Sequence, residues 1–256
     1  MDMKIAGSGV ITAGEYDKVG ISGSVKSEGL IRCKEFRCSG AFSGNSDIEC
    51  EGDMHISGAF SNRGTLSSKE FNVSGSAKNE GRLSSDIIKV SGAFKVEGDC
   101  ASDEKISVSG GFKCGGTLRG AEVKISGGLK VSGDFEAEDA YITGGISCGG
   151  LINAENLRIE LSNSYGSKAE SIGGSKIIIE NYREKGIIEK LFGRKKFGFA
   201  VSESIEGDEI IIERTSAKTV TGKYVMIGED CDIGLVQYSE SVEISPKAKV
   251  GKCEKI

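Results

Sequence analysis

Proline, tryptophan and histidine are almost absent from this chain of 256 residues. It has one proline, no tryptophan and a single histidine, His55. A lone histidine cannot supply the histidine clusters of most catalytic zinc sites. No apolar run approaches the ~18 residues of a membrane-spanning helix. The formal net charge of −5 is mildly acidic, so we expect no nucleic-acid partner.

A secretory signal is also missing. The opening residues, Met1 to Gly7, lack the charged and apolar regions of a signal peptide, so we expect a cytoplasmic protein. Reduced thiols are the norm there, and the eight cysteines recur at repeat positions typical of small core residues. No C-x-x-C motif occurs, and we expect neither a metal site nor a cofactor.

Glycine, by contrast, is abundant and periodic. A Ser-Gly pair recurs every 17 or 18 residues from Ser22-Gly23 to Ser126-Gly127, and Thr143-Gly144 is an eighth copy. Counting from each glycine, positions two and eight residues on are mostly apolar, position six is mostly glycine, and position ten is small. A short, regular period of this kind indicates a repeat architecture.

The local pattern within one repeat favours strands. Apolar residues alternate with polar ones over three to five residues, which is the period of a strand, and glycines punctuate these runs. Helical repeats need 30 or more residues and helix-forming composition. We therefore predict an all-β fold, a parallel β-helix (β-solenoid) with three-sided coils of about 17 residues. We expect glycine at the bends because it accepts positive φ.

The repeat changes after residue 180 and then resumes. Ile172 to Glu180 closely resembles Ile205 to Glu213, and Ile210, Ile227 and Ile244 are again 17 apart. The predicted organisation is therefore solenoid coils over 1–180, an insertion over 181–204, and further solenoid over 205–256.

The predicted insertion combines basic and bulky apolar residues outside the repeat register. The candidate docking residues are Lys190, Leu191, Phe192, Arg194, Lys195, Lys196, Phe197 and Phe199. Three interpretations stay open: attachment to an anionic membrane surface, docking to a protein partner, or packing of the segment against the solenoid.

We do not expect an enzyme. The stretch Ile227 to Gly234 is similar to hexapeptide-repeat acyltransferases, but those enzymes use a histidine from a loop between coils. His55 instead lies within a repeat, and no P-loop motif is present.

Short glycine-punctuated coils, together with the stretches Val225 to Gly234 and Val242 to Gly251, make the chain resemble the bactofilins. The resemblance implies a right-handed β-helix that assembles end to end into filaments without nucleotide or metal. It also implies a scaffold at the inner face of the membrane. Partners would be further copies of the chain, a related bactofilin, or an envelope or motility protein.

The terminal coils are the candidate polymerisation sites, because open solenoid ends expose unpaired strand edges. The predicted end residues are Ile5, Val10, Ile11, Val242, Ile244, Val250 and Ile256. The alternative is a solenoid that does not polymerise and binds a protein partner through its flank or the 181–204 insertion.

Overall fold

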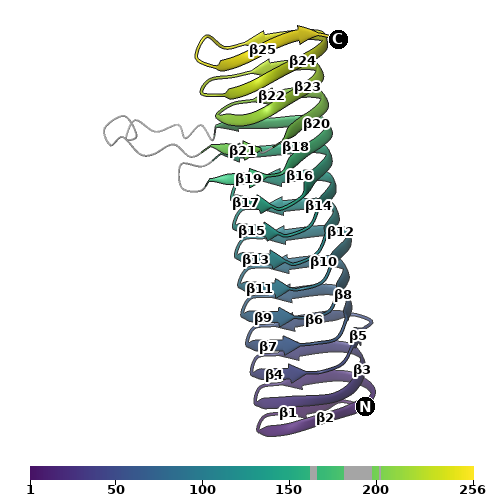
Figure 1. Ribbon diagram of the computed structural model, residues 1–256. Helices are drawn as coiled ribbons and strands as arrows, with labels where there is room; N and C mark the ends of the chain where they lie inside the picture. Colours follow the sequence, from purple (N-terminus) through teal and green to yellow (C-terminus); the bar gives the residue numbers. More distant parts are fainter. Residues whose placement is uncertain (162–165, 182–197, 202) are drawn as a thin grey trace, which may run out of the picture. The chain divides into compact units, whose positions relative to one another are not determined.

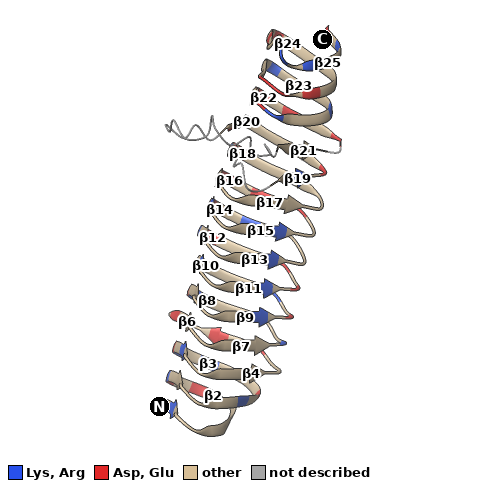
Figure 2. Cartoon of the chain, turned by 90° about the vertical axis from the view of Figure 1, so that its left-hand side faces the viewer, with Lys and Arg blue, Asp and Glu red and all other residues tan. Residues whose placement is uncertain are grey.

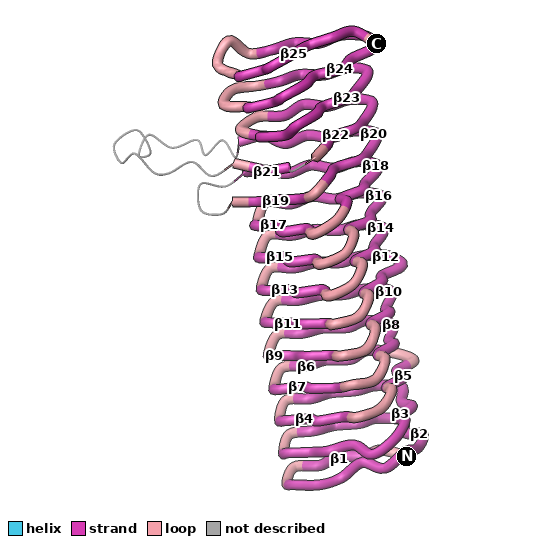
Figure 3. The backbone as a smooth tube through the Cα atoms, viewed as in Figure 1, coloured by secondary structure: helices cyan, strands magenta, loops and turns pink. Residues whose placement is uncertain are grey.

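The computed structural model describes residues 1–161, 166–181, 198–201 and 203–256. The chain divides into two compact units, Met1–Gly133 and Asp134–Ile256, here called the N-terminal and C-terminal units. Within the described residues, every regular element is a β-strand (Figures 1 and 3). All pairings within each unit are parallel. The predicted all-β parallel solenoid is therefore confirmed in both units.

The N-terminal unit contains fifteen strands. They are β1 (Met3–Ile5), β2 (Ser8–Ile21), β3 (Ser24–Cys38), β4 (Ala41–Gly44), β5 (Ile48–Cys50), β6 (Asp53–Ile56), β7 (Ala59–Asn62), β8 (Leu66–Val73), β9 (Ser76–Asn79), β10 (Leu83–Val90), β11 (Ala93–Val96), β12 (Cys100–Val108), β13 (Gly111–Cys114), β14 (Leu118–Ile125) and β15 (Gly128–Val131).

A typical coil has one short and one long strand. β9 pairs with β7 and β11, whereas β10 pairs with β8 and β12. The long strand bends in the middle: in β10 the buried residues alternate normally up to Ser85, and the alternation changes phase before Ile88. One bent strand thus supplies two of the three predicted sides. The 18-residue spacings are also explained here, since β12 inserts an extra residue opposite the bend of β10.

Inward residues of successive coils stack into columns. The ring centroids of Phe94 and Phe112 lie 5.2 Å apart with nearly parallel planes, and Phe42 stacks on Phe60 in the same way at 5.0 Å. Such aromatic pairs add about 0.5–1.5 kcal/mol beyond the burial of their area. Because equivalent residues repeat at the strand spacing of about 4.8 Å, a side chain that suits one coil also suits the next.

Two inward columns of the N-terminal unit contain polar residues, which form hydrogen bonds with one another between coils. The fully buried Asn62 donates from Nδ2 to Asn79 Oδ1 at 3.1 Å, and Asn79 donates to the carbonyl of Arg82 at 3.0 Å. The hydroxyl oxygens of Ser68 and Ser85 lie 3.1 Å apart. These ladders reduce the cost of burying polar groups, although Asn62 Oδ1 has no hydrogen-bond partner among the described residues.

The Ser-Gly pairs form one corner of each coil. The backbone N–H groups of Ser91 and Gly92 both donate to the carbonyl of Val73 in the preceding coil, at 2.8 and 3.1 Å. The same two hydrogen bonds to one shared carbonyl recur along the N-terminal unit. A Cβ on Gly92 would lie 2.0 Å from the carbonyl oxygen of Gly75, so only glycine allows the coils to approach this closely.

Positive φ is not the reason for these glycines, contrary to our expectation. Among the described glycines only Gly29 has a positive φ, of 95°. What the corners of successive coils share is the close approach of one backbone to the next, which the missing Cβ permits. Our prediction of glycine at the bends is confirmed, but its explanation by backbone conformation is wrong for the Ser-Gly pairs.

The C-terminal unit repeats the same construction with ten strands. They are β16 (Phe135–Ile142), β17 (Gly145–Cys148), β18 (Leu151–Leu161), β19 (Ser167–Ala169), β20 (Ser171–Asn181), β21 (Phe199–Val201), β22 (Ser204–Ile212), β23 (Thr215–Ile227), β24 (Asp232–Ile244) and β25 (Lys249–Lys255). The echo between Ile172 to Glu180 and Ile205 to Glu213 corresponds to the direct pairing of β20 with β22.

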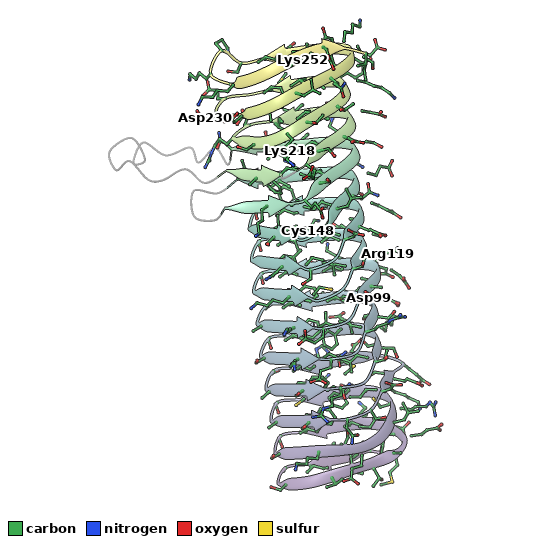
Figure 4. All side chains as sticks on the ribbon, in the orientation of Figure 1. Asp99, Arg119, Cys148, Lys218, Asp230 and Lys252 are labelled. Carbon is green, nitrogen blue, oxygen red and sulfur yellow. The ribbon has the colours of Figure 1, made fainter. Side chains whose placement is uncertain are left out.

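All eight cysteines are free thiols, and seven of them are buried, as expected for small core residues. Cys148, labelled in Figure 4, is one of these. Burial raises the pKa of Cys38 and of Cys114 to about 11. The exception is Cys253 on β25, which is exposed.

Replacing Gly92 by alanine should destabilise the N-terminal unit by about 1–3 kcal/mol, because the new Cβ would overlap the carbonyl of the preceding coil. Gly111→Ala is the matched control: nothing lies within 4 Å of a Cβ there, and we expect no loss or a gain of up to about 1 kcal/mol. Urea unfolding followed by circular dichroism measures both variants. Equal stability of the two would contradict this explanation of the corner.

Burial also predicts the reactivity of the thiols. At low protein concentration and neutral pH, Cys253 should react with a thiol reagent within minutes, whereas the other seven should react only after unfolding. Counting modified thiols by mass spectrometry before and after addition of denaturant tests this. Rapid modification of a second cysteine in the folded protein would contradict the placement of the thiols in the core.

Candidate assembly edges

The first coil of the N-terminal unit has strands with a neighbour on one side only. β1 pairs with Val19–Ile21 of β2, and the earlier part of β2 pairs with β3. In the part of the chain that the structure describes, no strand pairs with their other side. The backbone N–H and C=O groups of this edge are therefore available to another strand.

The predicted residues of this edge have different positions. Ile5 is half-buried, and its side chain fills the space above Gly9, whose Cβ would lie 3.2 Å from Ile5 Cγ2. Ile11 is fully buried, so its side chain belongs to the core of the coil and is not exposed at the end. Val10 is 53% exposed but pairs with Lys26 on an outward face. All three residues lie on the edge strands β1 and β2, and their role in polymerisation stays a prediction.

Tyr16 is an edge residue that the sequence analysis missed. It aligns with Cys33 and, through it, with Cys50, in a column that otherwise contains small residues. Its hydroxyl donates to the carbonyl of Thr12 at 2.9 Å. The ring is half-buried in the first coil, and a Cβ on Gly14 would lie 3.3 Å from its hydroxyl oxygen. The signal was a bulky residue in a column of small ones.

An ion pair holds the first coil to the second. Lys34 Nζ lies 2.6 Å from Asp17 Oδ1, and this interaction is the main reason why the pKa of Asp17 is lowered to about 2. Both side chains are exposed, so the pair contributes little to stability.

The last coil of the C-terminal unit presents the corresponding edge. The end of β24, Ser241–Ile244, pairs with β23, and β25 pairs with the beginning of β24. Within the described residues these strands have no partner on their far side. Ile244 is 40% exposed, Val242 and Val250 are half-buried, and Ile256 is 65% exposed after the end of β25.

One strand before the C-terminal edge, a tyrosine also stands in a column of small residues. Tyr238 aligns with Gly222, which aligns in turn with Gly207, and on its other side it aligns with Lys255 of β25. On the outer surface of these coils, Gln237 connects its neighbours: it accepts a hydrogen bond from Thr221 at 3.3 Å and donates to Glu254 at 3.0 Å. Side-chain hydrogen bonds from Lys252 and Gln237 lower the pKa of Glu254.

Strands occupy both ends of the predicted insertion, 181–204. β20 ends at Asn181, whereas Phe199 lies in β21 and pairs with Ser167 and Thr215. Phe199 is 1% exposed, so its inclusion among the docking residues is wrong: it is a core residue of a coil. The remaining docking residues, 190–192 and 194–197, lie outside the described residues.

The point where the chain leaves the coil is held by hydrogen bonds. Glu213 Oε2 accepts hydrogen bonds from the backbone and side-chain nitrogens of Asn181, both at 3.1 Å, and Arg214 donates to Asn181 Oδ1. Arg214 is buried and has a φ of 49°. Its burial lowers the pKa of the guanidinium. These contacts hold the last residue of β20 in place.

Other kinds of site have little support in the described residues. No group of three or more histidine, cysteine, aspartate or glutamate side chains is placed to hold a metal ion there. His55 has Asp53 as its acidic neighbour, with 3.9 Å between Nε2 and Oδ2. No helix in this part of the chain has the length and apolarity to cross a membrane.

Comparison with known proteins gives a family for part of the chain. Residues 43–136 match the model of the bactofilin family, described as polymer-forming cytoskeletal. This segment runs from β4 to the start of β16 and lies almost wholly in the N-terminal unit.

Two proteins of Bacillus subtilis (strain 168) are similar to shorter segments. The uncharacterized protein YhbF is 33% identical over 90 residues, which is 35% of each chain. The uncharacterized protein YhbE is 46% identical over 55 residues, or 22% of this chain and 23% of YhbE. The chain thus spans about a third or less of the length of these relatives. No solved structure matches it. The family resemblance expected from the sequence is confirmed over residues 43–136, which match the bactofilin model.

Proposed function

We propose that this protein is a non-enzymatic scaffold that assembles into filaments through the edges of its first and last coils, without nucleotide or metal. The match to a polymer-forming cytoskeletal family supports a structural role in general. The observation that carries the specific proposal is the pair of strand edges, which have no partner in the described residues.

The physical basis is the same hydrogen bonding that stacks the coils. A strand of another copy that pairs with β25 or β1 would satisfy backbone groups as neighbouring coils do, at the same spacing of about 4.8 Å. Partly exposed apolar residues, Ile5 and Ile244 among them, would then be buried.

Filaments of this kind would act in the cytoplasm, at the inner face of the cell membrane, where they would position envelope or motility proteins or copolymerise with a related bactofilin. We further propose that the segment over 182–197 docks the filament to such a partner or to the membrane. The hydrogen bonds of Asn181 with Glu213 and Arg214 support this role, because they hold the coil in place next to this part of the sequence. A solenoid that binds partners without polymerising is the alternative.

Charge at an edge should prevent assembly. Ile244→Arg and Ile5→Asp should each abolish filaments in electron micrographs, because a charge buried between coils has no partner. Leu151→Arg is the matched control, since Leu151 is also 40% exposed but lies on β18, away from the edges.

Labelling of Cys253 gives a second measurement. On assembly of the wild type, the exposed thiol on β25 should become protected, and this protection should be absent in Ile244→Arg. A wild-type protein that stays monomeric at high concentration, or an edge variant that assembles normally, would refute the proposal.

Deleting residues 182–197 and joining Asn181 to Gly198 through a short glycine-serine linker should leave assembly intact while weakening partner binding. Electron microscopy of the variant and co-purification of partners from cells measure the two effects. Filaments lost together with binding would instead show that the segment takes part in the assembly contact.

A further inference from the structure

One outward face of the N-terminal unit has an unusual composition. It comprises the first part of β3 and the short strands β4, β7, β9, β11, β13 and β15, which pair in register. Two outward columns cross it. One column consists of Lys26, Ser43, Ser61, Lys78, Lys95, Lys113 and Lys130, here called the lysine row. The other consists of Ser24, Ala41, Ala59, Ser76, Ala93, Gly111 and Gly128.

Over these seven strands neither column contains a carboxylate, an aromatic ring or a bulky apolar side chain, whereas on β2 the column of the lysine row continues to the exposed Val10. Four lysines follow one another on consecutive coils at about 4.8 Å spacing. Figure 2 shows them as blue segments on β9, β11, β13 and β15. Beside them the surface is flat: at Gly111 and Gly128 nothing lies within 4 Å of a Cβ position.

Carboxylates balance only part of this charge. Two residues after the row lysine, just beyond the short strand, two coils have a glutamate: Lys78 lies 3.1 Å from Glu80, and Lys95 lies 2.5 Å from Glu97. In the next two coils, the residues at this position are glycine and serine. Lys113 and Lys130 form no ion pair within the described residues. The end of the row on β13 and β15 therefore carries unbalanced positive charge.

The long strands on another side of the same coils differ in this respect. There, acidic and basic residues alternate between columns and pair with one another. Lys89 contacts Glu70 at 3.0 Å, and Lys105 contacts Glu122 at 2.9 Å. This contrast identifies the lysine row as a local feature, since the protein as a whole is acidic.

We propose that the lysine row is a contact surface for an anionic lipid bilayer. A flat face that carries a straight row of flexible ammonium groups can lie on a layer of lipid phosphates, with every lysine at the headgroup level at once. Each lysine near an anionic surface strengthens binding by about fivefold. One copy carries the complete row, so the contact does not require filament formation.

Other polyanions fit this face less well. Single-stranded nucleic acid is bound by aromatic side chains that stack on bases, and neither column has one. Specific recognition of carboxylate or phosphate groups usually employs arginine, and the basic residues of the row are all lysines. A flat, groove-free row of lysines suits the planar, sequence-independent charge of a bilayer.

Vesicle flotation tests the proposal, because filaments sediment but do not float on their own. The full chain should float with vesicles of equal parts phosphatidylglycerol and phosphatidylcholine, not with phosphatidylcholine alone, and added salt should release it. Lys113→Glu/Lys130→Glu should weaken this binding at least tenfold. Both side chains are exposed, so the circular dichroism spectrum should not change.

Lys69→Glu/Lys223→Glu is the matched control. Both residues are exposed, lie outside the row, and give the variant the same net charge as the row variant. It should keep most of the binding. The row variant should also weaken flotation when residues 182–197 are deleted, which separates the row from that segment.

Four results would overturn the proposal: no flotation of the wild type, equal flotation of the row variant, an equal loss in the control, or complete loss on deletion of 182–197 alone. Preferential binding of a single-stranded oligonucleotide or an acidic protein, in competition with vesicles, would assign the row to that ligand instead.

Discussion

The approach of each coil to the next at the Ser-Gly corner is the constraint on which the rest of the fold depends. Two N–H groups, those of Ser91 and Gly92, share the carbonyl of Val73, and this contact leaves no room for a Cβ on the glycine. Because the corner recurs in every coil of the N-terminal unit, each coil must return to the same point after 17 residues, or after 18 where the long strand has a bulge, as in β12.

A fixed corner places equivalent side chains directly above one another, so each column selects one kind of residue. Phenylalanines stack on phenylalanines, and Asn62 on Asn79, because a side chain that finds a partner in its own column needs no partner elsewhere. The column of small residues has two bulky exceptions. Tyr16 occupies it in the first coil, where one side of the column has no neighbouring coil, and Tyr238 occupies it opposite Lys255 of the last strand.

Outward positions are free of this selection, and functional differences are therefore concentrated there and at the edges. On one face of the N-terminal unit the outward columns contain lysine, serine, alanine and glycine, whereas on another lysines and carboxylates pair across coils. At the edges, the backbone itself is the available surface. Assembly through edges and lipid contact through a face would therefore use separate parts of the molecule and would not compete.

The amino-acid sequence by itself determined the period, the parallel coils, the resumption of the solenoid before Ile210, and the placement of most cysteines in the core, because all of these follow from a residue pattern that repeats locally. Only the tertiary structure decided which feature of glycine matters at the corner, that Phe199 belongs to a coil, and that Ile11 points inward while Val10 points outward. It also brought the lysines of the row onto one face. These facts depend on the register between coils and on where each bend falls, and a shift of one residue in either moves a side chain from the core to the surface.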